Sequence, residues 1–175
     1  LSTGVFKQES YWKLSDITAD CSSQSANDYI DKYREILTDS VNLRLMGDVE
    51  FGTFLSGGID SAAVTAIASE KHQFPTFTVM SESTLGNGEV ATAHSVATSL
   101  GLPNHPLFFD WKNLGVQPDD WRKILWHCEF FGINAEQLYK YYLHQFAREA
   151  YPNLKIILLG QGSDEFNGGY IQTLL

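Results

Sequence analysis

The sequence predicts an α/β fold, with a parallel twisted sheet and helices on both faces. Short strand-like runs alternate with helical segments of about a dozen residues, the pattern of strands joined by right-handed helical crossovers. Residues 154–159 form a mostly apolar run, as expected of a strand that is buried on both faces. Two glycine-rich polar loops, 56–61 and 160–170, directly follow strands. Parallel sheets bind ligands beyond the carboxyl ends of their strands, so these loops are the expected functional region.

The first half of the fold is expected to be helix, strand and helix. Apolar side chains recur at helical spacing over residues 27–46, and the turn at Gly47 and Asp48 ends this helix. Residues 49–55 read as a strand that stops at the first glycine-rich loop. Residues 60–71 are alanine-rich with apolar side chains on one face, which predicts the second helix.

The second half is expected to continue the alternation. A strand over residues 74–80 is followed by a helix over 88–100, which Gly101 closes as a typical C-terminal stop. The remaining elements follow from the same two periodicities. They are a strand over 107–109, helices over 121–126 and 134–150, and a last strand over 154–159.

Composition excludes several function classes. The 175 residues are 43% apolar and 13% aromatic, which excludes a disordered chain and suits one packed domain. The net charge of -9 argues against nucleic-acid binding, because no basic excess is present to neutralise phosphates. No apolar run approaches the roughly 18 residues of a membrane span. Cys21 and Cys128 cannot form a disulfide framework, which indicates a reducing, cytoplasmic compartment.

The loop at residues 56–61 (Ser-Gly-Gly-Ile-Asp-Ser) has the chemistry of a phosphate site. Its paired glycines permit a tight turn, and the helix that follows presents its positive end to an anion. The hydroxyls of Ser56 and Ser61 can donate to phosphate oxygens. Asp60 would repel a bare phosphate, so its presence indicates a bridging Mg²⁺. The loop is neither a Walker A motif nor a dinucleotide fingerprint, and a tight turn without a ligand is the simpler alternative.

This loop resembles the pyrophosphate-binding loop of the PP-loop ATP pyrophosphatase superfamily, which has the pattern Ser-Gly-Gly-x-Asp-Ser. The resemblance implies an adenine nucleotide α-hydrolase-like fold, with ATP and Mg²⁺ as cofactors. It also implies a reaction in which a carboxylate is adenylated and pyrophosphate is released.

The loop at residues 160–170 (Gly-Gln-Gly-Ser-Asp-Glu-Phe-Asn-Gly-Gly-Tyr) resembles the second signature of the glutamine-hydrolysing asparagine synthetase family. Its Asp164 can join Asp60 in holding Mg²⁺. The family usually carries glutamate at the position of Gln161, and β-lactam synthetase relatives carry tyrosine there. A glutamine cannot act as a general base. The resemblance therefore implies ATP-dependent amide formation, with asparagine made from aspartate as the leading product.

Two alternatives stay open: a β-lactam-type or peptide-cyclising relative, and a non-catalytic nucleotide-binding fragment. For an asparagine synthetase and for a β-lactam-type or peptide-cyclising relative alike, the resemblance assigns catalytic roles to Asp60, Gln161 and Asp164. It assigns metal binding to Asp60 and Asp164. It assigns nucleotide contacts to residues from both loops and the strand ends: Phe54, Ser56, Gly57, Gly58, Asp60, Ser61, Val79, Gly160 and Gly162.

Other polar residues near these loops have simpler interpretations. Arg44 and Asp48 are better read as a salt bridge at a helix end than as catalytic groups. Glu89 matches an acidic position of the family, and it equally suits a first-turn glutamate that complements a helix dipole. Cys128 is expected to be buried packing rather than a nucleophile, and His105 lacks metal-ligand spacing and is expected to be structural.

The resemblance also implies a larger parent protein. In the family, a glutaminase domain precedes the synthetase domain, which continues well past the Gly-Gly-Tyr with a catalytic lysine. Residues 1–26 are therefore expected to be a junction after an absent glutaminase domain, and 27–175 the N-terminal part of a truncated synthetase domain. The implied partners are a carboxylate acceptor, ammonia or glutamine-derived nitrogen, the missing segments and a second copy in a homodimer. The isolated chain is expected to be inactive.

Overall fold

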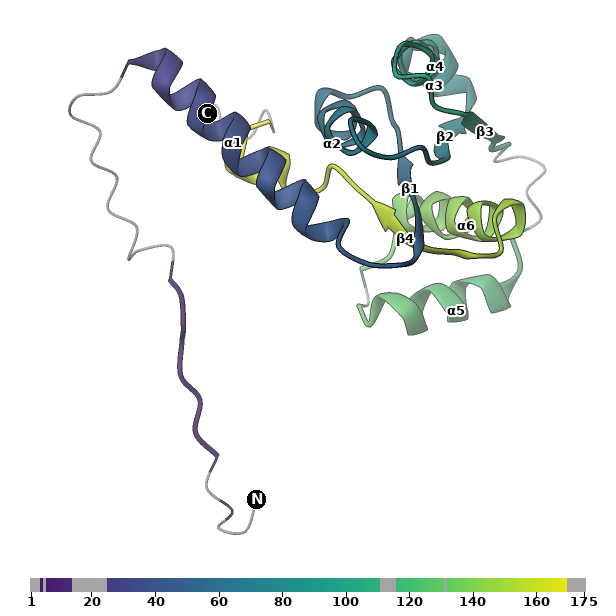
Figure 1. Cartoon of the computed structure of the whole chain (residues 1–175). Coiled ribbons are helices and arrows are strands. Elements are labelled where there is room, and N and C mark those ends of the chain that lie inside the picture. The colour runs from purple at the N-terminus through teal and green to yellow at the C-terminus, as the bar shows by residue number, and fades with distance from the viewer. Residues whose placement is uncertain (1–3, 5, 14–24, 111–115, 131, 170–175) are drawn as a thin grey trace. The chain divides into compact units, whose positions relative to one another are not determined.

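Four parallel strands form one sheet in the order β3-β2-β1-β4 (Figure 1). The computed structural model describes residues 4, 6–13, 25–110, 116–130 and 132–169. The strands are β1 (Glu50–Phe54), β2 (Thr76–Met80), β3 (Asn104–Phe108) and β4 (Leu154–Leu158). In the register of the central strands, Thr53 of β1 lies beside Thr76 of β2 on one side and Leu158 of β4 on the other.

One helix precedes β1, and the others lie between the strands and after β4. Within the described ranges they are α1 (Ala26–Arg44), α2 (Ile59–Ser69), α3 (Glu82–Gly86), α4 (Glu89–Ser99), α5 (Pro118–Cys128), α6 (Ala135–Ala150) and α7 (Ser163–Asn167). Each expected helix and strand is present. The expectation of a parallel sheet with helices on both faces is confirmed.

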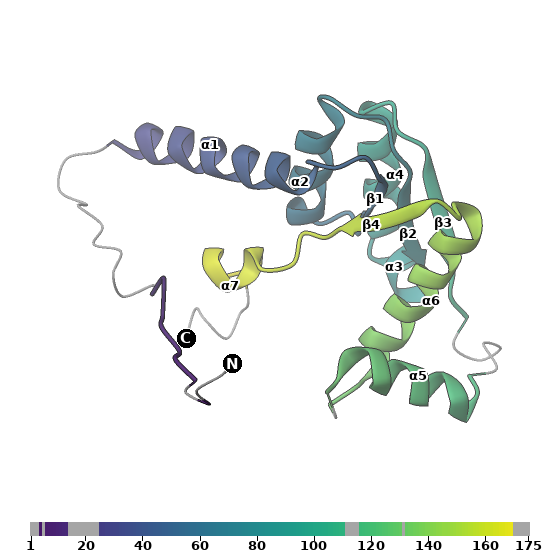
Figure 2. The same cartoon turned by 60° about the horizontal axis from the view of Figure 1, so that its bottom comes forward.

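Two short helices, α3 and α7, are not predicted by the sequence. Each has five residues, too few to show an apolar periodicity. A capping box starts α3, because the Ser81 side chain accepts from the Thr84 backbone N–H and the Thr84 side chain accepts from the Ser81 backbone N–H. Figure 2 shows α7 following the end of β4, inside the segment expected to be a loop.

Strand β3 begins earlier than expected, at Asn104 rather than at residue 107. The sequence there is a poor strand former because it contains asparagine and proline. Pairing with β2 compensates, since Asn104 Nδ2 donates to Thr76 Oγ1 and Thr78 Oγ1, each at 2.9 Å. Pro106 is tolerated because, in the part of the chain that the structure describes, β3 is an edge strand paired with β2.

Helices cover both faces of the sheet (Figure 1). On one face, α2 and α4 bury Ala68, Ala93 and Ala97 against residues of the sheet and its flanking loops. On the other face, α6 buries Leu143 against Phe77, which is itself fully buried. Helix α5 packs on α6 through Ile124.

The strand order creates a switch point between β1 and β4. The chain winds from β1 through β2 to β3 in one direction, and then crosses back to place β4 on the other side of β1. Loops that follow β1 and β4 are therefore neighbours at the carboxyl edge of the sheet, the place where open α/β sheets bind ligands.

The chain separates into two compact units, residues 1–38 and 39–175. In the first unit, apolar side chains of α1 are exposed, among them Tyr29, Ile30 and Tyr33. None of the helices in the described ranges has the length and apolar character needed to cross a membrane. Cys21 and Tyr170 lie outside the described residues.

Candidate functional site

A pocket of about 430 Å³ opens at the switch point. Its walls come from the ends of β1, β2 and β4, the loops that follow them, and the first turns of α6. The pairing of β1 with β4 explains why two loops that are about a hundred positions apart in sequence face the same space.

The loop after β1 is closed by hydroxyl groups. Ser61 Oγ accepts from the Ser56 backbone N–H at 3.2 Å and donates to the Gly58 carbonyl oxygen at 3.1 Å. The Ser56 hydroxyl lies 3.0 Å from Ser61 Oγ and accepts from the Gly58 N–H at 3.3 Å. Ser61 is buried, and its one hydroxyl proton is donated within the loop. Ser56, in contrast, is exposed and lines the pocket. Ser56 is thus the hydroxyl better placed to meet a ligand.

Two glycines allow close backbone approach around this loop. Gly57 has a φ of 84°, and a Cβ there would collide with the Glu89 carbonyl oxygen, so the loop lies directly against the start of α4. A Cβ on Gly160 would lie 2.6 Å from the Ser61 backbone nitrogen and 2.7 Å from the Asp60 carbonyl carbon. The loops after β1 and β4 therefore pack backbone against backbone, and glycine is required at both positions.

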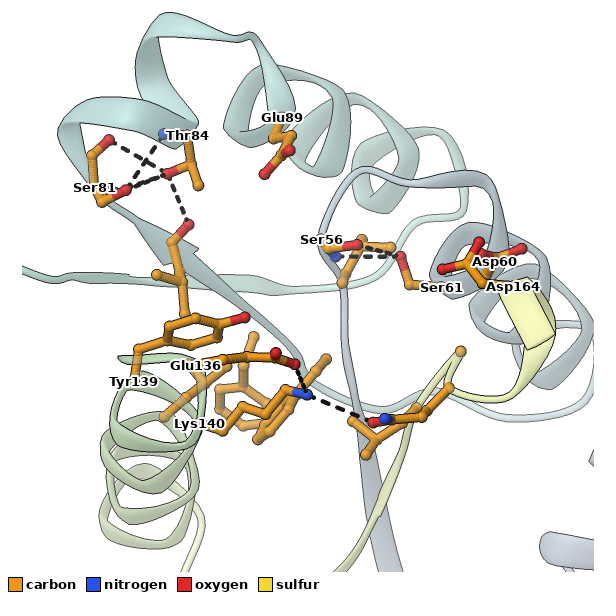
Figure 3. A pocket seen from close by; sticks show the side chains of 18 of the residues that line it. Ser56, Asp60, Ser61, Ser81, Thr84, Glu89, Glu136, Tyr139, Lys140 and Asp164 are labelled. Atoms are coloured by element: carbon orange, nitrogen blue, oxygen red, sulfur yellow. Dashed lines mark hydrogen bonds and ion pairs between the residues drawn. The ribbon is translucent and has the colours of Figure 1, made fainter. Parts of the chain in front are cut away.

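Two carboxylates mark one end of the pocket. Asp60 lies in the first turn of α2 and Asp164 in the first turn of α7, and both line the pocket. Figure 3 shows them at the same end, away from Glu136 and Lys140. Among the described residues, no three His, Cys, Asp or Glu side chains converge to hold a metal. Two carboxylates nevertheless fit Mg²⁺, which takes one or two protein carboxylates together with waters and substrate phosphates.

The opposite end of the pocket is polar and comes from α6. Asn134 caps this helix, because its side chain accepts from the Glu136 N–H at 2.7 Å. One turn later, Lys140 Nζ forms an ion pair with the Glu136 carboxylate and lies 3.5 Å from Gln161 Oε1 (Figure 3). Partial burial, and then the charges of Glu136 and Glu89, raise the pKa of the Tyr139 hydroxyl, which remains neutral in this setting.

The wall between these two ends is apolar and aromatic. Phe54, Val79 and Leu143 all line it. The Phe54 ring contacts the His144 ring at a tilt of 60°, with centroids 4.6 Å apart, and loss of hydration and the Lys140 charge lower the pKa of that imidazole. The Val79 carbonyl accepts from Thr84 Oγ1 at 3.3 Å, which ties α3 to the pocket rim. The site thus combines an apolar wall with two charged ends.

The pocket gathers most of the residues that the sequence predicts for the site. Those that line it are Phe54, Ser56, Asp60, Ser61, Val79, Gly160, Gln161, Gly162 and Asp164. Gly57 and Gly58 shape the first loop without lining the pocket. Glu89 also lines it, while its Oε1 accepts from Asn87 Nδ2 at 2.9 Å in the first turn of α4, so both of its interpretations stay open.

Sequence reasoning missed the contribution of α6. Glu136, Tyr139 and Lys140 line the pocket, although in the sequence Tyr139 belongs to an apolar helix stripe and the two charged residues resemble an ordinary solvated face. The available signal was a Glu-x-x-x-Lys pair next to the buried stripe that includes Leu143, which places opposite charges one turn apart at the border of the core.

Three expectations about flanking residues can be compared with the structure. The expected burial of Cys128 is wrong: it is exposed at the last position of α5, where Glu129 (φ 50°) turns the chain. Arg44 Nη1 donates to the Ser40 carbonyl oxygen at 3.3 Å, and no ion pair with Asp48 is found among the described residues. The structural role of His105 is confirmed, since its Nε2 lies 2.8 Å from the Tyr151 hydroxyl oxygen.

Comparison with known proteins adds a family assignment to this geometry. The family model described as asparagine synthase matches residues 32–174. The chain is 48% identical over 178 residues to glutamine-hydrolyzing asparagine synthetase 2 of Bacillus subtilis (strain 168), a match that covers 99% of this chain and 24% of that protein. It is 33% identical over 146 residues to asparagine synthetase 1 of the same organism, covering 81% of this chain and 21% of the relative.

Among solved structures, the chain is similar to an NMN synthetase from Francisella tularensis, with 18% identity and a TM-score of 0.43. That match covers 85% of this chain and 60% of the other. The chain spans about a quarter of the length of the two Bacillus subtilis relatives that it matches.

Proposed function

Because the chain belongs to the asparagine synthase family, we propose that it is the ATP-binding part of an ATP-dependent amide ligase. The complete enzyme would adenylate a carboxylate, release pyrophosphate and let an amine displace AMP. Aspartate is the proposed acceptor and asparagine the product. The observation that carries this proposal is the backbone contact of Gly160 with Asp60 and Ser61, which joins the two family loops in one pocket.

The pocket suggests how Mg²⁺-ATP would lie. The backbone amides of residues 56–61 and the start of α2 would hold the pyrophosphate moiety. Asp60 and Asp164 would hold Mg²⁺, which when bound offsets the charge that develops as pyrophosphate departs. Phe54 and Val79 offer an apolar surface of the kind that suits the adenine ring.

The chain's own residues limit the chemistry at the acceptor end. The Gln161 amide can donate and accept hydrogen bonds but cannot remove a proton, so deprotonation of the incoming amine falls to another group. This observation also supports the second candidate, a β-lactam-type or peptide-cyclising ligase. Turnover of aspartate with ammonia, compared with bulkier amino-acid acceptors, separates the two.

The test of the proposed reaction is isotope exchange. The complete protein should catalyse exchange of labelled pyrophosphate into ATP, and the exchange should depend on the acceptor acid. Formation of ADP and orthophosphate instead would contradict the adenylation mechanism. The isolated chain should bind Mg²⁺-ATP without synthesising an amide, and amide formation by residues 1–175 alone would contradict its assignment as a part of the enzyme.

The same proposal concerns the rest of the enzyme. Residues 1–26 would be the junction after a glutaminase domain that delivers ammonia, and residues 27–175 would be continued by a helical segment with a lysine near the adenylate. The complete protein would act as a cytoplasmic homodimer. Size-exclusion chromatography with light scattering tests the dimer, and glutamine-dependent asparagine formation tests the glutaminase.

A further inference from the structure

Strand β1 reaches the pocket without completing its hydrogen-bond ladder to β2. The Leu55 N–H donates to the Phe77 carbonyl oxygen at 2.9 Å, which continues the parallel pairing of Phe54 with Phe77. In a regular parallel ladder, the next bond would run from the Val79 N–H to the Leu55 carbonyl oxygen. In the part of the chain that the structure describes, this backbone bond is absent. The two strands therefore separate at Leu55, one residue before Ser56 opens the first loop.

A side chain takes the place of the missing backbone donor. Thr78 Oγ1 donates to the Leu55 carbonyl oxygen at 2.8 Å, and both residues are buried, with exposed fractions of 2% and 1%. A buried carbonyl oxygen that lacks a donor destabilises a fold, so this hydroxyl allows the strands to separate while the carbonyl stays satisfied. Thr78 does not line the pocket, and its effect on a ligand would therefore act through Leu55.

Asn104 of β3 fixes the direction in which this hydroxyl points. Its Nδ2 donates to Thr78 Oγ1 and to Thr76 Oγ1, each at 2.9 Å. Each hydroxyl has one proton, and that proton goes to a carbonyl oxygen: from Thr78 to Leu55, and from Thr76 to Pro103 at 3.0 Å. Every proton in this network thus has one acceptor. The network runs from the edge strand β3 through β2 to the end of β1.

The first loop is well ordered within itself, so its position depends on Leu55. The Ser56 N–H donates to Ser61 Oγ, and Ser61 Oγ donates to the Gly58 carbonyl oxygen. Without the Thr78 hydroxyl, the next donor of the ladder is the Val79 N–H. Pairing with it would extend the β1–β2 ladder by one bond and draw Leu55 and the attached Ser56 toward β2.

We propose that Thr78 and Asn104 are positioning residues for the pyrophosphate loop. They hold β1 and β2 apart at Leu55, so that the backbone amides of residues 56–61 are aligned before the nucleotide arrives. A loop already in its binding conformation binds more tightly than one that must first be drawn back. The inference rests on the proposed function and adds to it two residues outside the pocket that determine its affinity for phosphates.

Calorimetric titration of residues 1–175 with Mg²⁺-ATP, Mg²⁺-pyrophosphate and AMP separates the loop from the rest of the pocket. Thr78→Val keeps the branched shape of the side chain and removes the hydroxyl. It should weaken ATP and pyrophosphate by roughly 5- to 50-fold. AMP, which lacks the pyrophosphate moiety, should weaken by no more than about twofold. Thr78→Ser restores a hydroxyl and should recover most of the affinity for ATP and pyrophosphate.

Thr76→Val is the matched control. Thr76 is equally buried on the same strand and accepts from the same Asn104 amide, but its proton goes to Pro103, at the end of β2 away from the loop. This variant should keep all three affinities within about twofold of the wild type. Asn104→Ala, which leaves the Thr78 hydroxyl free to turn, should weaken ATP and pyrophosphate by less than Thr78→Val does.

The proposal is refuted if Thr78→Val binds ATP and pyrophosphate as the wild type does, or if Thr76→Val weakens them equally. Equal losses for AMP and pyrophosphate would also refute it, as would a wild-type chain that binds neither ATP nor pyrophosphate. If Thr78→Val does not fold, the comparison of Asn104→Ala with Thr76→Val decides in the same way. Failure of the proposed function has a different result: the complete protein then shows no acceptor-dependent pyrophosphate exchange, although Thr78→Val still weakens pyrophosphate more than AMP.

Discussion

Gly160 lies so close to Asp60 that a Cβ on Gly160 would be 2.7 Å from the Asp60 carbonyl carbon. This relationship joins the loop after β4 to the loop after β1, and each loop leads into a helix whose first turn carries one of the two carboxylates that line the pocket. The nearest atom to the added Cβ, at 2.6 Å, would be the Ser61 backbone nitrogen. Backbone atoms of a helix start cannot move aside as a flexible side chain can, so the contact depends on glycine.

Substitution Gly160→Ala is therefore expected to separate the two loops. Overpacking of this kind costs about 1–3 kcal/mol in the free energy of unfolding. Urea unfolding of residues 1–175 measures the loss, and calorimetric titration with Mg²⁺-ATP measures the accompanying loss of affinity. The control is Gly86→Ala, because a Cβ at Gly86 meets no heavy atom within 4 Å. Equal stability of the two variants would contradict the contact.

The adjacent glycines of the first loop should respond differently to alanine. Gly57 has a φ of 84° and faces the Glu89 carbonyl oxygen, so Gly57→Ala combines backbone strain with a collision and should cost roughly 1–3 kcal/mol. Gly58 has a φ of -75°, and its nearest contact would be Ser56 Oγ at 3.4 Å. In thermal or urea unfolding, Gly57→Ala should have a clearly lower free energy of unfolding than Gly58→Ala. The reverse order would show that the loop adopts another conformation.

The two carboxylates should carry the magnesium dependence of nucleotide binding. Asp60→Asn and Asp164→Asn each remove one charged ligand, and each should weaken Mg²⁺-ATP by roughly 10- to 100-fold. Affinity for ATP measured in EDTA should not fall and is expected to rise, because without a metal each carboxylate only repels the phosphates. Asp119→Asn, at an exposed ion pair with Arg122 on α5, is the matched control. A variant of Asp60 or Asp164 with unchanged magnesium dependence would remove that residue from the metal site.

Tyr142, which lies behind the apolar wall of the pocket, should lose its hydroxyl proton at a higher pH than an ordinary tyrosine. Burial, and then the hydrogen bond to Asp120, raises the pKa of Tyr142 to about 12 from the ordinary 10.0, and its hydroxyl oxygen lies 2.9 Å from Asp120 Oδ2. Because the folded state keeps this proton longer than the unfolded state does, the stabilising contribution is complete below pH 10. It is lost as the pH rises toward 12.

Ultraviolet difference titration of wild type against Tyr142→Phe isolates the tyrosinate signal of this side chain. The midpoint should lie near pH 12 and should move down in Asp120→Asn, which removes the acceptor carboxylate. Between pH 10 and 12, unfolding free energy should fall more steeply in the wild type than in Tyr142→Phe. A midpoint near pH 10 in the folded wild type would contradict the Asp120 contact.

The local sequence determined the alternation of strands and helices and the chemistry of the two loops. Periodicity reports which side chains are buried, and this placed α6 from its apolar stripe, including Leu143. The Ser-Gly-Gly-Ile-Asp-Ser pattern at residues 56–61 is equally local, because a tight strand-to-helix turn needs its glycines and hydroxyls within one segment. These features depend on neighbours in the chain, so they can be read from it directly.

Only the tertiary structure decided which polar side chains share the pocket. Lys140 and Gln161 are 21 positions apart, and Glu136 and Lys140 alone look like a solvated pair on a helix surface. Their common position follows from the return of the chain to β4 beside β1, because strand order is chosen by long-range packing of both sheet faces. The same dependence on distant partners explains the early start of β3 at Asn104, which bonds to side chains of β2.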